Sequence, residues 1–111
     1  MKSTINFEDF SAVDLRVGTI IKVDDFPEAR NPAYQLTIDF GELGVKKTSA
    51  QITTLYTKDE LLKRQIVAVV NFPKKQVAKF MSECLVLGAV KDKDVMLLHP
   101  EQRIKNGTSV L

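Results

Sequence analysis

The stretch from Asp14 to Val23, which reads DLRVGTIIKV, constrains the fold more than any other part of the chain. It mixes apolar and polar residues in a strand-like rhythm and is rich in β-branched side chains, which predicts a strand. One glycine, Gly18, lies at its middle. Glycine inside a strand usually marks a bulge, a sharp bend or a close backbone approach. A long strand bent at this glycine can pair with one set of strands at its first end and with another set at its second end. The stretch therefore predicts the first strand of a small barrel.

The composition is that of one ordinary globular domain. The 111 residues are 44% hydrophobic and 27% charged, which suffices for a single core without metal or disulfide support. We expect one domain over residues 1–111, with a core of about 12–98 and with terminal extensions at 1–11 and 99–111 that lie in a dimer interface. The sequence has no membrane-length apolar run and no signal-peptide pattern, and its single cysteine, Cys84, suits a reducing compartment. We therefore expect a cytoplasmic protein that does not insert into a membrane.

Further strands and one short helix follow the first strand. Residues 56–64 have a helical period, and Thr57 and Glu60 form a capping box at its start. The remaining apolar patterns predict strands at residues 34–40, 45–52, 65–70, 84–90 and 95–98, with a long connection at 71–83. Five strands with a helix between the third and the fourth form the OB-fold barrel. The predicted fold class is therefore an all-β, five-stranded OB-fold barrel with N- and C-terminal extensions.

Both ends of the chain carry more apolar residues than free termini need. Residues 5–13 predict a short helical turn packed on the barrel, and the Asn106-Gly107 turn precedes one more possible strand at 108–111. The apolar side chains at the ends either belong to the core of one subunit or meet a partner subunit. We expect an isologous homodimer with the interface residues Ile5, Phe7, Phe10, His99, Val110 and Leu111.

The sequence offers no catalytic group of residues. His99 is the only histidine, so no zinc site and no histidine-based triad can form without further ligands. Cys84 lies in an apolar strand after Glu83, and a nearby carboxylate raises rather than lowers the pKa of a thiol. No glycine-rich phosphate loop occurs. We therefore predict no enzymatic activity, no cofactor and no metal, with His99 as a structural or interface residue.

The best candidate for binding is the connection at residues 71–83. OB-folds bind ligands on strands two and three and on the loops after strands one and four, which here are residues 25–33 and 71–83. The second loop combines cations and aromatic rings: Phe72, Lys74, Lys75, Lys79 and Phe80. Cations engage phosphates, and aromatic faces stack on bases or accept apolar side chains. The alternative is a charged loop whose phenylalanines point into the core.

The charge distribution leaves the ligand class open. Residues 1–44 carry a net charge of −4 and residues 45–111 carry +6. A basic second half suits nucleic acid or another acidic partner, and it equally suits a solvated surface.

Several motifs resemble the tRNA-binding domain family, the EMAP-II-like OB-folds that are appended to aminoacyl-tRNA synthetases or occur as free homodimers. The resemblance rests on Asp14–Gly18, on Asn71-Phe72 and on Ser82-Glu83, and it covers about residues 8–110. It is closest to the free-standing CsaA branch, which is described as a secretion-related chaperone. The runs that favour this branch are 26–34, 47–51, 69–73 and 82–88.

The resemblance implies a function and a set of contact residues. The tRNA-binding relatives usually carry a shorter His-Pro-Asn-Ala-Asp-like loop after strand one and more basic residues around the site. This difference favours an ATP-independent homodimeric chaperone for unfolded or export-bound polypeptides over the alternative, a tRNA-binding homodimer. The residues expected to contact peptide or tRNA are Phe26, Arg30, Asn31, Tyr34, Gln51, Asn71, Phe72, Lys74, Lys75, Phe80, Ser82 and Glu83.

Overall fold

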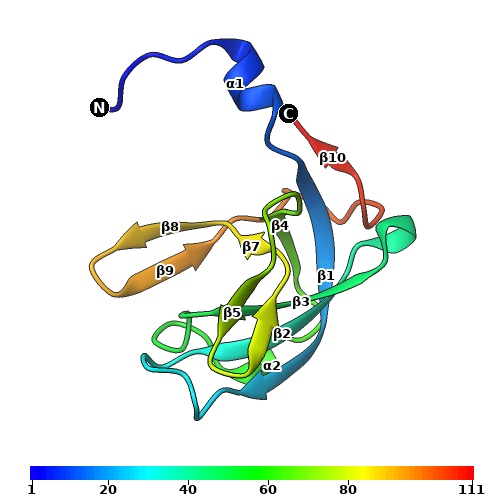
Figure 1. The fold of residues 1–111 in the computed structure, drawn as a ribbon. Helices are drawn as coiled ribbons and strands as arrows, with labels where there is room; N and C mark the ends of the chain where they lie inside the picture. The colour runs from blue at the N-terminus through cyan, green and yellow to red at the C-terminus, as the bar shows by residue number, and fades with distance from the viewer.

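The computed structural model describes all residues from Met1 to Leu111, and one curled antiparallel sheet forms its centre (Figure 1). The strands lie in the order β3-β2-β1-β4-β7, and β10 pairs with β1. Their bounds are β1 (Leu15–Asp25), β2 (Tyr34–Asp39), β3 (Val45–Ala50), β4 (Gln65–Val69), β7 (Leu85–Val86) and β10 (Ser109–Val110). The five strands β3, β2, β1, β4 and β7 form a nearly closed barrel, so the predicted OB-fold class is confirmed.

The strand β1 connects the two sides of the barrel, as its sequence predicts. Residues 15–19 pair with β4, and residues 19–25 pair with β2. Gly18 is a close-approach position, because a Cβ atom there would lie 2.6 Å from Cγ2 of Ile38 and 2.7 Å from the Phe40 ring. The bulge itself lies between Ile20 and Lys22. The glycine thus lets the core side chains of Ile38 and Phe40 pack against the β1 backbone.

A buried apolar cluster fills the barrel, and a set of hydrogen bonds closes its open side. Ile20, Leu36, Ile38, Phe40 and Ile66 are completely buried. On the open side, the Glu83 N–H donates to the Lys47 carbonyl at 2.7 Å, and the Lys47 N–H donates to Oε1 of Glu83 at 2.9 Å. These bonds join β3 to the segment just before β7. They supply the closure that the short β7 does not.

The helix α2 (Lys58–Leu61) lies between β3 and β4, and its capping box forms as predicted. The Glu60 N–H donates to the Thr57 hydroxyl at 3.3 Å, and the Thr57 N–H donates to Oε1 of Glu60 at 2.9 Å. The helix is shorter than the predicted span 56–64, because Leu62 is already extended and Lys63 has a φ of 71°. A short 3-10 turn, η1 (Gly41–Leu43), joins β2 to β3.

Two hairpins replace the simple connection and strand predicted for residues 71–90. The connection 71–83 contains β5 (Lys75–Val77) and β6 (Phe80–Ser82), which pair with each other. The predicted strand 84–90 is interrupted at Leu87, whose N–H still bonds to Val67 of β4 while its carbonyl accepts the Leu98 N–H. The chain therefore leaves β4 there and forms a second hairpin from β8 (Gly88–Lys91) and β9 (Asp94–Leu97), which projects from the barrel (Figure 1).

The terminal segments lie together at one end of the barrel. The helical turn expected near the N-terminus is present as α1 (Phe7–Ser11), but the prediction that it packs on the barrel is wrong. None of its residues is buried, and it stands beyond the start of β1, beside the C-terminus (Figure 1). The reason is that the link at residues 12–14, a turn and a bend, carries the helix beyond the end of β1 and away from the barrel wall. The extra C-terminal strand is confirmed as β10. Neither α-helix has the length or the apolar character needed to cross a membrane.

Candidate functional site

A cleft of about 640 Å³ opens beside the β5–β6 hairpin. Its lining residues are Phe26, Glu28, Gln35, Ala78, Lys79 and Phe80. The rings of Phe26 and Phe80 are 5.4 Å apart and tilted by 56°. Phe26 is only 5% exposed, whereas Phe80 is half-buried. Phe26 therefore supports the Phe80 ring, and Phe80 provides accessible aromatic surface next to charged Glu28 and Lys79.

A second hollow, of about 630 Å³, lies under the loop between β1 and β2. It is lined by Asp25, Phe26, Pro27, Ala29, Arg30, Pro32, Ala33, Tyr34 and Thr53. The Tyr34 hydroxyl donates to the Tyr56 carbonyl at 2.8 Å, so the Tyr34 ring is fixed at the edge of this hollow. Since Phe26 lines both hollows, we call their combined lining residues the Phe26 surface. The structure thus brings Phe26, Arg30, Tyr34 and Phe80 together, as expected for an OB-fold.

Ser82 and Glu83 attach the hairpin to β3. The Ser82 and Thr48 hydroxyls are 2.8 Å apart, and Glu83 accepts the backbone bond from Lys47. Lys74 Nζ lies 3.5 Å from Oε2 of Glu83. The Lys47 N–H, with the positive charge of Lys74 as a lesser cause, lowers the pKa of Glu83. Ser82 and Glu83 therefore already have hydrogen-bond partners inside the chain, and no pattern in the sequence shows these partners.

Asn71 lies elsewhere, at the base of the N-terminal arm. Its Oδ1 accepts the Asp14 N–H at 2.9 Å, and its Nδ2 donates to the Ala12 carbonyl at 2.8 Å. It lines a cleft of about 390 Å³ near both chain ends. Four of the predicted interface residues, Phe7, Phe10, Val110 and Leu111, also line this cleft. Ile5 and His99 do not.

The other predicted contact residues lie on exposed surface outside the Phe26 surface. They are Asn31, Gln51, Phe72, Lys74 and Lys75. Phe72 is 52% exposed, so the alternative that it points into the core is wrong. Residues that the prediction of contacts left out are Glu28, Gln35, Ala78 and Lys79. Gln35 could have been found from the polar face of its alternating strand. Lys79 is recognised as a cation of the candidate loop, although it is not among the predicted contact residues. Glu28 gives no signal beyond its place in the loop.

The structure gives Cys84 the properties of a core residue. Its side chain is buried, and burial raises the pKa of its thiol to about 12. A thiol with such a pKa stays protonated at neutral pH and is a poor nucleophile. No group of three or more His, Cys, Asp or Glu side chains is placed to hold a metal ion.

Comparison with known proteins identifies the family. Residues 15–109 match the model of the putative tRNA binding domain. The crystal structure of the chaperone CsaA from Bacillus anthracis strain Ames is 55% identical with a TM-score of 0.94, and the match covers 98% of this chain and 100% of that one. The CsaA chaperone protein from Picrophilus torridus is 50% identical with a TM-score of 0.91, over 97% of this chain and 100% of that one.

A longer relative shares only part of its length with this chain. The methionine–tRNA ligase of Thermococcus onnurineus strain NA1 is 35% identical over 106 residues, which are 96% of this chain but 14% of that enzyme. The two CsaA structures, in contrast, are each matched over their full length. This chain belongs to the tRNA-binding domain family and, within it, is a homologue of the CsaA chaperones.

Proposed function

We propose that this chain is a cytoplasmic, ATP-independent chaperone that acts as a homodimer, binds unfolded or export-bound polypeptides in protein secretion, and catalyses no reaction. The observation that carries this proposal is the Phe26 surface, where accessible Phe80 lies beside a cleft with both apolar and charged walls. The full-length similarity to two CsaA chaperones supports it. The sequence has no glycine-rich phosphate loop, which agrees with action without ATP.

The composition of the cleft suits an extended apolar segment. An apolar side chain of the client would rest on Phe80, and Gln35 would offer donors and acceptors to the client backbone. Lys79 and Glu28 would take up charged residues that flank the apolar segment. In a homodimer, two such clefts would hold one long client at two points and so raise the overall affinity.

Replacing Phe80 by alanine tests this proposal. Because Phe80 provides accessible aromatic surface in the cleft, we expect Phe80→Ala to weaken binding of a labelled unfolded peptide about tenfold, as measured by fluorescence anisotropy. Phe72→Ala is the matched control, because Phe72 lies on the same segment but outside the Phe26 surface. The Phe72→Ala variant should bind the labelled peptide with the affinity of the wild type. If the two substitutions have equal effects, or if neither has an effect, the cleft beside Phe80 is not the peptide-binding site.

The second candidate function is that of a tRNA-binding homodimer. The match to the tRNA-binding domain model favours it, as do the exposed cations of the β5–β6 hairpin, of which Lys75 and Lys79 have no carboxylate partner. On this reading, Lys75→Ala flattens the log–log salt dependence of tRNA binding by about one unit. Submicromolar binding that persists at physiological salt would favour this function over the chaperone. Binding that disappears with added salt would reduce it to a general basic surface.

A further inference from the structure

A polar pocket of about 250 Å³ lies between the start of β4 and the segment 99–103. It shares no residue with the Phe26 surface. Its lining residues are Arg64, Gln65, His99, Pro100, Glu101, Gln102 and Arg103. Polar side chains thus dominate this pocket, unlike the cleft beside Phe80. A ligand for it must be polar, and two arginines among its lining residues point to a negatively charged one.

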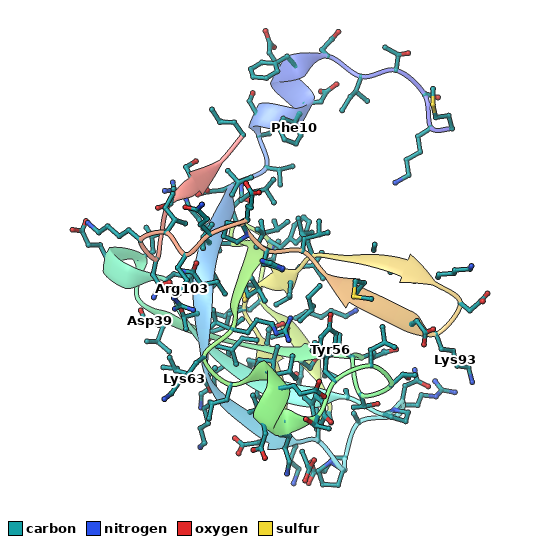
Figure 2. All side chains as sticks on the ribbon, turned by 180° about the vertical axis from the view of Figure 1, so that it is seen from behind. Phe10, Asp39, Tyr56, Lys63, Lys93 and Arg103 are labelled. Atoms are coloured by element: carbon teal, nitrogen blue, oxygen red, sulfur yellow. The ribbon has the colours of Figure 1, made fainter.

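Contacts inside the chain orient both guanidinium groups. Arg103 donates to the Lys63 carbonyl at 2.9 Å and to the Thr19 hydroxyl at 3.3 Å, and Figure 2 shows it next to Lys63 on one side of the barrel. The guanidinium of Arg64 lies 5.1 Å from the centre of the Tyr56 ring. A guanidinium group has five N–H donors, so these contacts leave donors available on each arginine.

Neither arginine of the pocket forms an ion pair, although Nε of Arg64 donates to the Glu60 carbonyl at 3.4 Å and the Arg64 charge adds to the Thr57 bonds in lowering the pKa of Glu60. None of the five ion pairs of the protein includes Arg64 or Arg103. Glu101 lines the pocket, but its carboxylate lies beyond ion-pair distance from both arginines. Two like charges held in one pocket repel each other, and a bound anion would relieve this repulsion. The pocket is therefore prepared for an anion before the anion arrives.

The neighbouring side chains also restrict what can bind. The Gln65 amide is already used, because its Nε2 donates to the Ile104 carbonyl and to Oδ1 of Asn106 while its Oε1 accepts the Ile104 N–H. In His99, Nδ1 lies 2.7 Å from the Pro100 carbonyl. The available groups are thus mainly guanidinium donors, whose planar forks match the oxygens of a phosphate group.

We propose that this pocket binds a phosphate group, carried either by inorganic phosphate and nucleoside monophosphates or by the backbone of a nucleic acid. This site is separate from the proposed peptide cleft and does not depend on the chaperone function. Arg64 and Arg103 supply the donors, and Glu101 opposes the ligand. Removing the charge of Glu101 therefore strengthens binding, whereas removing the charge of Arg64 weakens it.

The test is a titration of the full chain with inorganic phosphate at constant ionic strength, followed by NMR at the arginine Nε–H and the backbone signals of residues 99–103. We expect saturable shifts. Arg64→Gln should weaken binding by about tenfold, the loss expected for a hydrogen bond between charged groups. Glu101→Gln should strengthen it by about threefold. The matched control is Lys93→Gln, which removes one positive charge at the tip of the β8–β9 hairpin, far from Arg103 (Figure 2).

The comparison of variants and ligands decides the outcome. Shifts that never saturate, or equal losses in Arg64→Gln and Lys93→Gln, would overturn the proposal, because general screening would then explain the effect. Glu101 is exposed and makes no side-chain hydrogen bond, so Glu101→Gln should fold normally. Its stronger binding therefore tests the proposal even if Arg64→Gln fails to fold. Adenosine monophosphate and a short RNA without a terminal phosphate identify the source of the group. If inorganic phosphate saturates the shifts, saturation by the monophosphate but not by the RNA indicates a terminal phosphate, and saturation by the RNA as well indicates that a backbone phosphate also binds.

Discussion

Glu83 joins three parts of the molecule through one residue. Its carboxylate accepts the Lys47 N–H of β3 and lies next to Lys74, while its own N–H donates to the Lys47 carbonyl. The residue therefore closes the barrel at the point where the β5–β6 hairpin meets β3. Because the ionised carboxylate makes better hydrogen bonds than the neutral acid, this closure depends on its charge.

The lowered pKa of Glu83 predicts a specific loss of stability in acid. A carboxyl group whose pKa is lower in the folded state stabilises the fold above its ordinary value of 4.5, and this contribution disappears as the pH falls through the folded value. We expect Glu83→Gln to lower the free energy of unfolding by about 1 kcal/mol at pH 7. The difference from the wild type should be smaller at pH 3, because protonation of Glu83 removes part of this contribution below pH 4.5. Urea unfolding of the wild type and of Glu83→Gln at pH 7 and at pH 3 measures the two differences in the free energy of unfolding.

Glu42→Gln is the control for this effect. Glu42 is exposed and lies 4.0 Å from Lys105. Its substitution should therefore leave the free energy of unfolding unchanged at pH 7 and at pH 3. A difference between wild type and Glu83→Gln that is equal at pH 7 and pH 3 would show that the ionised carboxylate has no part in closing the barrel.

Residue roles could be predicted from the sequence where the partners are close in the chain. Thr57 and Glu60 are three residues apart, and their capping box was predictable for that reason. The partners of Asn71 are 59 and 57 residues away, and Glu83 meets Lys47 across 36 residues. Both were predicted only as ligand contacts, because no local pattern shows a hydrogen bond that forms when distant strands meet.

At the scale of elements, Asn71 fixes the direction of the N-terminal arm. The helix α1 has no buried residue, so packing does not hold it against the barrel. The bonds from Asn71 to Ala12 and Asp14, together with the bond from the Val70 N–H to the Asp14 carbonyl, secure its base. The orientation of α1 therefore depends on a residue that begins the segment leading to the β5–β6 hairpin.

Substitution of Asn71 should release the arm without unfolding the barrel. We expect Asn71→Ala to speed hydrogen exchange at the Asp14 amide by about tenfold, since the bond to Oδ1 is lost. Asn71→Asp keeps an acceptor for Asp14 and loses the donor to Ala12, so its effect at Asp14 should be smaller. Asn31→Ala, at an exposed asparagine, is the control. Unchanged exchange in Asn71→Ala would mean that the backbone alone fixes the arm.

Strands with clear periods were predictable, and so was the turn between the predicted strands 84–90 and 95–98, which joins β8 to β9. The β5–β6 hairpin and the interruption at Leu87 were not. The patterns at 34–40 and 65–70 gave β2 and β4 within one residue at the C-terminal end of each. The β5–β6 hairpin was missed because its turn contains Ala78 with a φ of 53°, a conformation that sequence rules assign to glycine or asparagine. The interruption at Leu87 was missed because apolar residues continue on both sides of it.

At the scale of the whole molecule, the exposed chain ends predict the assembly. Phe7 is 73% and Leu111 is 94% exposed, and both line the same terminal cleft. We expect sedimentation to report twice 12.5 kDa. Replacing Phe7 and Phe10 by serine should shift the protein towards the monomer, because apolar area lost from an interface weakens association.

Val90→Ser is the control for the assembly. Val90 is equally exposed but lies on the β8–β9 hairpin, away from both ends. A wild-type protein that is monomeric at micromolar concentration would contradict the homodimer. A dimer that survives the Phe7 and Phe10 substitutions would place its interface elsewhere.

The site as a whole was predictable only in part. The OB-fold analogy placed Phe26, Tyr34 and Phe80 near one another, because that fold brings its loops after strands one and four together. The polar pocket was not predictable. Arg64 and Arg103 lie far apart in the sequence and meet only through the Lys63 carbonyl and the start of β4.

The pairing of β10 with β1 has a mechanical consequence. Leu15 lies opposite Val110, so the two chain ends leave the sheet at the same end of this antiparallel pair. A force that pulls the ends apart therefore loads the hydrogen bonds between the two strands one after another, as in a zipper, and not all at once. Optical-tweezer traces should show a small early extension as β10 detaches at low force. A single large extension should follow when β1 is peeled from β4 and β2, because the rest of the barrel is built on that strand.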